Sequence, residues 1–242
     1  GLEDDLNTKL SILILVTFVT ILSVVRGIDG GVKILSNANM LLAATLLAFV
    51  IVVGSITQVG QWIFFTTEHY LKNIIPLSNS VGREDMQWMR DWTVFYWAWW
   101  VSWSPFVGLF IARISKGRTV REFMLAVLLV PTMVTIIWMS VFGMNAIEQA
   151  QAGIGGLADG ISSVSLATFE MLASLPFAAL TTFMGILLVL IFFITSSDSG
   201  SLVIDSITAG GKVNSPAPQR IFWAVIQGLI AGAVSYTHLT LP

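Results

Sequence analysis

The residues of this chain best suited to binding a ligand are its tryptophans. Five of its nine tryptophans lie between Trp92 and Trp103, in a stretch without charge from Trp92 to Ala112. In membrane proteins, tryptophan usually lies singly at the level of the lipid headgroups. A cage of electron-rich ring faces instead binds a cation that cannot donate hydrogen bonds, such as a quaternary ammonium group. The cluster therefore indicates a cation-binding site, with a packing seam or an interfacial belt as the alternative.

Helical periodicity predicts which rings act together. Positions i, i+4, i+7 and i+11 of a helix share a face, and here they hold Trp92, Tyr96, Trp99 and Trp103. Trp100 lies at the flank of this face, whereas Trp97 points elsewhere and is expected to serve packing or lipid contact.

The stripe ends at a proline. Pro105 is expected to kink or break the helix, and the hydroxyls of Ser102 and Ser104 can bond to carbonyls that the proline leaves free. A broken helix beside aromatic side chains at membrane depth is typical of transporter binding sites. Helix packing explains the same spacing equally well.

Composition places the chain in a membrane. Hydrophobic residues make up 55% and charged residues 11%, against roughly a quarter charged in soluble domains. Uncharged stretches of roughly the 20 residues that cross a bilayer predict an all-α integral membrane protein with five full spans and part of a sixth. The stretches are Ser11–Val25, Ala38–Thr67, Trp92–Ala112, Phe123–Ile147 and Met171–Ser197, and the partial span begins near Ile221.

Several other classes of function find no support. The sequence has no cysteine, its two histidines are far apart, and no basic run suggests a nucleic acid. No metal-ligand spacing and no nucleophile with a nearby general base is found, so we expect neither an enzyme nor a cofactor.

Basic residues predict the orientation. Alternating the loops between the two sides places eight lysines and arginines on one side and four on the other. The richer side is expected to be cytoplasmic.

A second candidate site lies near the end of the span Met171–Ser197. Thr195 and Ser196 offer hydroxyls and nearby carbonyls to a sodium ion, and Asp198 stands close. Alternatively, these residues simply end a helix and Asp198 caps the following segment, Ser199–Ala209.

The connecting segments also carry patterns. Glu68–Asp91 alternates charged and apolar residues, which predicts two short amphipathic pieces at the membrane surface, interrupted at Pro76 and Gly82. A short helix is expected within Leu166–Leu175, with Pro176 opening the next span. Thr119 and Glu122 form a possible capping box.

The ends suggest an internal piece of a longer protein, because the sequence starts at Gly1 without methionine. Residues 234–242, VSYTHLTLP, break the apolar pattern and resemble a translated sequencing adapter. We therefore expect the transmembrane domain to cover residues 1–233 and give Tyr236 and His238 no functional weight.

Three segments carry a family resemblance. Residues 91–123, DWTVFYWAWWVSWSPFVGLFIARISKGRTVREF, closely resemble the signature of the betaine/carnitine/choline transporter family. Residues 194–199, ITSSDS, and 31–40, GVKILSNANM, look like segments of the same family. The resemblance extends to about Ala233.

The resemblance implies a twelve-helix transporter of the bacterial inner membrane, built from two inverted five-helix repeats and usually trimeric. This chain would hold the sixth to tenth helices and the start of the eleventh, with Glu68–Asp91 at the trimer contact. By position, Trp99, Trp100 and Trp103 match substrate-binding tryptophans, and Trp92 matches an outer aromatic position.

The remaining matches concern the pathway and the coupling ion. Phe106 and Phe110 match aromatic residues of the inner pathway. Thr195 and Ser196 match a sodium site, with Phe192 beside it. Sodium-independent carnitine exchangers carry tyrosine in place of Trp103, so this chain resembles the ion-coupled importers.

We therefore expect a secondary transporter that imports a trimethylammonium solute, with glycine betaine favoured, choline next, and sodium as coupling ion. A proton-coupled choline or carnitine transporter is the alternative. A membrane sensor that binds the same ligand without moving it represents a different class.

Overall fold

The computed structural model describes residues 5–54, 56–212 and 215–240, and the side chains of Ile28, Asp29 and His238–Thr240 are left aside. All regular structure in these residues is helical, which confirms the predicted all-α class. The chain forms two compact units: Gly1–Ala43 with Ile186–Pro242, and Ala44–Gly185.

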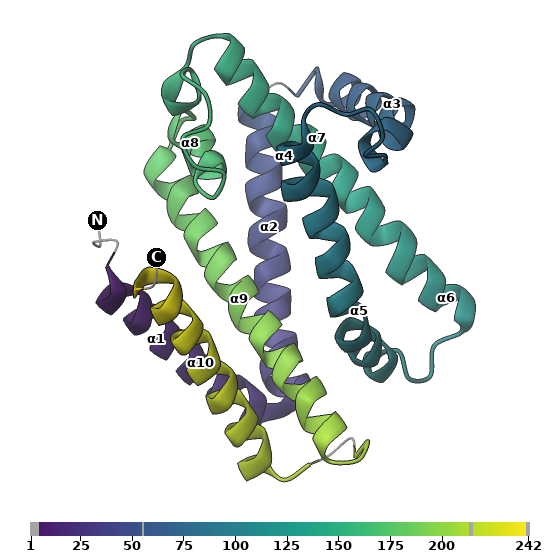
Figure 1. The fold of residues 1–242 in the computed structure, drawn as a ribbon, viewed down its shortest axis with the longest axis vertical. Coiled ribbons are helices and arrows are strands. Elements are labelled where there is room, and N and C mark those ends of the chain that lie inside the picture. The colour runs from purple at the N-terminus through teal and green to yellow at the C-terminus, as the bar shows by residue number, and fades with distance from the viewer. Residues whose placement is uncertain (1–4, 55, 213–214, 241–242) are drawn as a thin grey trace. The chain divides into compact units, whose positions relative to one another are not determined.

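The first unit contains α1 (Leu6–Gly27), a π-helical turn η1 (Ile28–Val32), the first part of α2 (Lys33–Val53), most of α9 (Ala178–Thr208) and α10 (Ala217–Thr240). Helices α1 and α10 pack along each other (Figure 1). Val24, Val32 and Leu202 form a buried apolar cluster that joins α1 and η1 to α9.

The second unit holds the rest of α2 together with the middle of the chain. Its elements are α3 (Val59–Ser78), α4 (Met86–Trp88), η2 (Met89–Val94), α5 (Phe95–Ile114), α6 (Val120–Met124), η3 (Leu125–Leu129), α7 (Val130–Gln151), η4 (Gly155–Leu157) and α8 (Ala167–Ala173), and the start of α9 ends the unit. The turns η2 and η3 are π-helical insertions within longer helical runs.

Helix α7 is the centre of this second unit. Trp62 of α3 is 4% exposed, and its indole Nε1 donates to Glu148 Oε1 at 3.2 Å. The hydroxyls of Thr66 and Ser140 also bond α3 to α7. Two hydrogen bonds from side chains therefore hold α3 against α7.

Five helical segments of the described residues are long and apolar enough to cross a membrane, as predicted. They are Leu6–Gly27, Gly30–Val53, Met86–Ile114, Val120–Gln151 and Ala178–Thr208. The protein is therefore a multi-pass membrane protein.

Two boundaries differ from the expectation. The predicted span Ala38–Thr67 ends early, because α2 stops at Val53 and α3 begins separately at Val59. A side chain at Gly54 would lie within 2.9 Å of the Asn145 amide nitrogen, so glycine allows close packing at this helix end.

The surface segment Glu68–Asp91 also differs. Its first part belongs to α3, which continues past Pro76 to Ser78, and its second part begins the helical run of α4, η2 and α5. The interruption falls at Gly82, whose φ of +77° is a conformation that glycine adopts without strain. The structure therefore confirms the break at Gly82 and contradicts the one at Pro76.

Of the predictions for the region of α8 and α9, one is confirmed and two are wrong. Helix α8 confirms the short helix predicted within Leu166–Leu175. However, Pro176 does not open α9, which begins at Ala178 after Phe177 adopts a positive φ of 56°. Helix α9 then continues to Thr208, so Asp198 lies inside it and is no N-cap.

Helix α10 runs without interruption to Thr240. The apolar pattern weakens after Ala233, but the backbone stays helical through the described part of residues 234–242. The proposed adapter origin of these residues stays a prediction.

Candidate functional site

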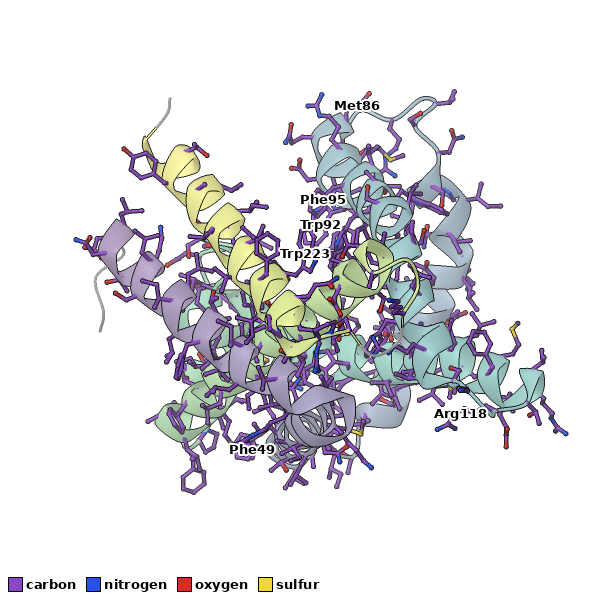
Figure 2. The ribbon with its side chains drawn as sticks, turned by 90° about the horizontal axis from the view of Figure 1, so that it is seen from below. Phe49, Met86, Trp92, Phe95, Arg118 and Trp223 are labelled. Carbon is purple, nitrogen blue, oxygen red and sulfur yellow. The ribbon has the colours of Figure 1, made fainter. Side chains whose placement is uncertain are left out.

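The tryptophan-rich stretch forms the helical run that begins at Met86 and continues through η2 into α5. Figure 2 labels Met86, Trp92 and Phe95 on this run. Leucine, tryptophan and phenylalanine are tolerated in helices and no charge interrupts α5 before Arg113.

The expected aromatic face exists. The rings of Trp92 and Tyr96 stack with centroids 6.0 Å apart and planes 5° apart. Tyr96 contacts Trp99 edge-on at 5.8 Å, and Trp99 contacts Trp100 at 6.2 Å. These are favourable geometries for aromatic pairs, and they join four of the rings into one strip.

Trp103 lies further along the same helix and has a different ring partner. Its ring stacks on Phe106 with centroids 5.8 Å apart and planes 28° apart. The structure thus pairs a predicted substrate-binding tryptophan with a predicted pathway residue. Phe110 lies half-buried one turn further along the helix.

The whole strip is open within this chain. No residue of α5 is buried, and Trp99, Trp100 and Trp103 are 50%, 60% and 38% exposed. Trp97 is 66% exposed. An exposed aromatic surface of this size marks a contact with lipid, protein or ligand.

Pro105 does not break the helix. Helix α5 is continuous from Phe95 to Ile114, although in Figure 1 it changes direction along its length, and its last part is seen almost end-on. The hydroxyl of Ser104 donates to the carbonyl of Val101 at 3.0 Å. This is the carbonyl that a residue with an N–H at position 105 would bond, so the predicted compensation by serine is confirmed.

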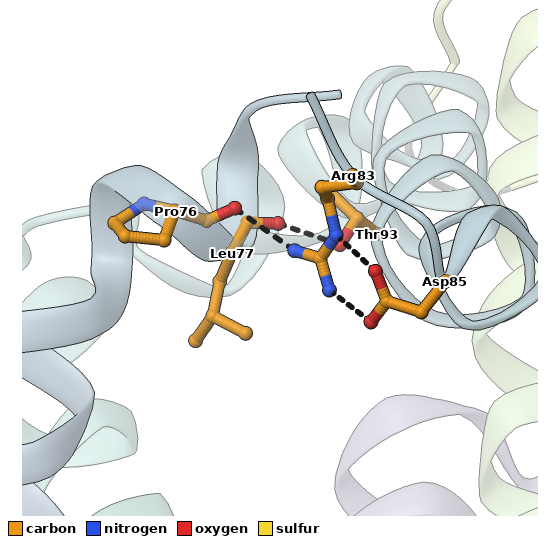
Figure 3. Close-up of polar contacts among 5 residues, drawn as sticks. All are labelled: Pro76, Leu77, Arg83, Asp85 and Thr93. Carbon is orange, nitrogen blue, oxygen red and sulfur yellow. Dashed lines mark hydrogen bonds and ion pairs between the residues drawn. The ribbon is translucent and has the colours of Figure 1, made fainter. Parts of the chain in front are cut away.

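A clasp of five residues holds the start of this run to the end of α3 (Figure 3). The Arg83 guanidinium binds both carboxylate oxygens of Asp85, at 2.7 and 2.6 Å, and donates to the carbonyl of Pro76 at 2.8 Å. Thr93 donates to the carbonyl of Leu77 at 3.0 Å. The hydrogen bonds from Arg83 lower the pKa of Asp85.

The arginine of this clasp also contacts an aromatic ring. Its guanidinium carbon lies 4.9 Å from the ring centre of Trp88, within the range of a cation–π interaction. The clasp therefore fixes the position of the residues that immediately precede Trp92. The amphipathic pattern of Glu68–Asp91, the segment that contains Arg83, gave no sign of this role.

The proposed sodium residues lie on α9, in the other unit. Thr195 and Ser196 are half-buried, and Phe192 is 61% exposed. The Thr195 hydroxyl donates to the carbonyl of Phe192 at 2.9 Å. The carbonyl of Thr195 accepts from the Ser199 hydroxyl at 2.9 Å.

A buried polar group beside these residues was only partly anticipated. Asp198 is 0% exposed and accepts a hydrogen bond from Ser23 of α1. Two turns later, Asp205 is 1% exposed and accepts from Ser215. Carboxylates within a long apolar helix were the available signal, because such residues are rare and usually functional.

Other hydrogen bonds hold α10 against α9 and α1. Ser201 donates to Gln227 at 2.7 Å, and Arg220 donates to the carbonyl of Val24 near the end of α1 at 2.9 Å. A polar seam therefore joins α1, α9 and α10 inside the first unit. The carbonyl-bonding arginine near a helix C-terminus also suits the helix dipole.

A comparison with family models decides the family. The model described as "BCCT, betaine/carnitine/choline family transporter" matches residues 1–239. The chain belongs to the betaine/carnitine/choline transporter family. This confirms the predicted resemblance, and membership of a transporter family excludes the intramembrane-enzyme class.

Similar proteins carry transporter names. The chain is 57% identical to a "Glycine betaine/proline/choline/ectoine transporter" of Vibrio parahaemolyticus, over 97% of this chain and 42% of that protein. It is 57% identical to "Glycine betaine transporter 1" of the same species, over 97% of this chain and 45% of the relative. It is 37% identical to the glycine betaine transporter OpuD of Bacillus subtilis, over 98% of this chain and 46% of the relative. The chain thus spans somewhat less than half the length of these relatives.

Proposed function

We propose that this chain is part of a secondary transporter that imports a trimethylammonium solute across the bacterial inner membrane. Glycine betaine is the favoured substrate and choline the next. Support comes from the family and from the relatives, whose names include glycine betaine and, in one case, proline, choline and ectoine. The aromatic face of α5 is the observation that carries the proposal, with ring contacts from Trp92 to Trp100 and between Trp103 and Phe106.

The chemistry of the strip suits this substrate. The methylated ammonium group of betaine cannot donate hydrogen bonds, so it binds through the electrostatic attraction of ring faces. Each ring is expected to contribute on the order of 1–2 kcal/mol once water is excluded. The rings of Trp99, Trp100 and Trp103 are the proposed ligands, with Trp92 as an outer binding position.

The inner pathway, the sodium site and the assembly are proposed from the family resemblance. Phe106 and Phe110 line the inner pathway. Sodium binds at Thr195 and Ser196 beside Phe192, and its downhill movement drives substrate accumulation through thermodynamic linkage. The full-length protein is expected to contain twelve helices and to assemble as a homotrimer.

Proton-coupled transport of choline or carnitine is the alternative within this class. The hydroxyl pair of α9 supports sodium as the coupling ion. Neutral hydroxyl oxygens can coordinate a metal cation, but they do not take up a proton near neutral pH. A non-transporting sensor would use the same strip for binding alone, and accumulation in proteoliposomes separates it from a transporter.

The substrate assignment is tested by a matched pair of tryptophan variants in the full-length protein. Trp103→Ala removes a ring of the strip, whereas Trp97→Ala removes an equally large ring that is 66% exposed and makes no ring contact with the strip. We expect Trp103→Ala to abolish uptake of labelled glycine betaine at normal expression, and Trp97→Ala to retain it. Uptake by Trp103→Ala with unchanged affinity would refute the cage.

The ion is tested separately. Thr195→Ala combined with Ser196→Ala should raise the sodium concentration that gives half-maximal uptake. An unshifted sodium dependence would favour coupling to protons.

A further inference from the structure

Asp198 is a fully buried carboxylate in the middle of α9. Its Oδ2 accepts a hydrogen bond from the hydroxyl of Ser23, whereas its Oδ1 has no hydrogen-bond partner. The side chain is 0% exposed. One neutral hydroxyl satisfies only part of a carboxylate, which has about four acceptor positions.

The described residues supply no cationic partner for this carboxylate. The ion pairs found there join Lys72 to Glu68 and Arg83 to Asp85, both far from α9 in the sequence. Arg220, which packs against the end of α1, donates to the carbonyl of Val24 instead. A carboxylate buried in a membrane without an opposite charge is costly, so such residues usually face an ion or a proton pathway.

One of the two proposed sodium ligands, Thr195, lies one helical turn from Asp198. Thr195 and Asp198 are three residues apart in a continuous α-helix, and side chains at this spacing have Cβ atoms about 5–6 Å apart. The hydroxyls of Thr195 and Ser196 are neutral, so alone they only partly compensate a cation for its lost hydration. A negative charge at this distance would favour binding of a cation, and the cation would in turn compensate the buried carboxylate.

We propose that Asp198 is the counter-charge of a monovalent cation site at Thr195 and Ser196, held in place by Ser23. The inference rests on the proposed sodium coupling and adds the residue that gives an otherwise neutral site its preference for cations. Asp198 acts through its charge, while the hydroxyls and carbonyls of Thr195 and Ser196 contact the ion.

Direct binding of ²²Na⁺ to the purified full-length protein without substrate tests this role. Asp198→Asn removes the charge but keeps an oxygen that can accept from Ser23. It is expected to weaken sodium binding at least about tenfold, which corresponds to about 1.4 kcal/mol. Glycine betaine affinity at saturating sodium should remain within about twofold, because the aromatic strip is unchanged.

Ser23→Ala is the matched control. It removes the hydrogen bond but keeps the carboxylate, so sodium affinity should fall by no more than about threefold. Equal losses in Ser23→Ala and Asp198→Asn would overturn the proposal, because the pair would then act by positioning α9. Wild-type sodium affinity in Asp198→Asn would overturn it as well.

Asp198→Glu keeps the charge and provides the test if the asparagine variant is not recovered folded. It should retain sodium binding, whereas a loss of tenfold or more in a folded Asp198→Glu protein would contradict a role based on charge. The Thr195→Ala/Ser196→Ala variant distinguishes failure of the proposed sodium site from failure of the proposed role of Asp198. Unchanged sodium binding in that variant refutes the sodium site itself, whereas unchanged binding in Asp198→Asn alone refutes only the counter-charge.

Discussion

Replacing Gly31 by alanine is expected to disrupt the polar seam of the first unit. A Cβ at this position would lie 2.6 Å from the Ser23 hydroxyl oxygen and 2.8 Å from its carbonyl carbon. Ordinary contacts begin near 3.4 Å, and the backbone of Ser23 within α1 cannot move away as a flexible side chain can. The substitution must therefore displace either η1 or the residue that bonds Asp198.

The magnitude follows from these two consequences. Overpacking a close contact costs about 1–3 kcal/mol. Loss of a hydrogen bond to a charged group costs about 1.5–3 kcal/mol more. We expect Gly31→Ala to destabilise the unit by about 3 kcal/mol or more, which for a unit of this size lowers the melting temperature by about 12 °C or more.

The neighbouring glycine provides the control. A Cβ at Gly30 would lie 3.5 Å from Arg26 Cβ, an ordinary contact. Thermal unfolding of the two purified variants, followed by intrinsic fluorescence, compares them directly. Equal melting temperatures for Gly30→Ala and Gly31→Ala would refute the packing account of Gly31.

Two further predictions concern the helical run of the tryptophan strip. Because Arg83 lowers the pKa of Asp85 below its ordinary 3.8, their link should be complete above about pH 4 and be lost only as the pH falls through that lowered pKa. Trp88 fluorescence should report this change at acid pH, and Asp85→Asn should abolish it; the same acid transition in that variant would contradict the assignment. Ser104→Ala should leave the Val101 carbonyl without its donor and lower thermal stability by about 0.5–1.5 kcal/mol. A Ser104→Thr protein, which keeps the hydroxyl, should match the wild type, and equal stability of all three would show that the serine bond contributes nothing.

Much of the fold could be predicted from the sequence, because hydropathy alone identifies helices that must satisfy their backbone within a membrane. The five spans follow from uncharged stretches, and the aromatic strip follows from helical periodicity. The capping box is also confirmed, since Thr119 and Glu122 bond reciprocally at the start of α6. These features depend on residues close together in the chain.

The parts that could not be predicted depend on residues far apart in the sequence. Helix α2 ends at Val53, and Asn145 of α7 packs against Gly54 directly after this end, a contact that hydropathy cannot reveal. From the sequence, Asp198 could equally be a helix cap. The structure places it inside α9, where it accepts a hydrogen bond from Ser23, which lies 175 residues earlier in the chain. Arg83 likewise carries no signal in its own segment, since its partners include a carbonyl at the end of α3.

The most direct test of transport is accumulation of labelled glycine betaine by the full-length protein in proteoliposomes under an inward sodium gradient. We predict accumulation above the external concentration, which collapses when sodium is replaced by potassium. Saturable binding of betaine with no accumulation under any ion gradient would contradict the account, because the aromatic strip would then belong to a receptor that holds its ligand without moving it.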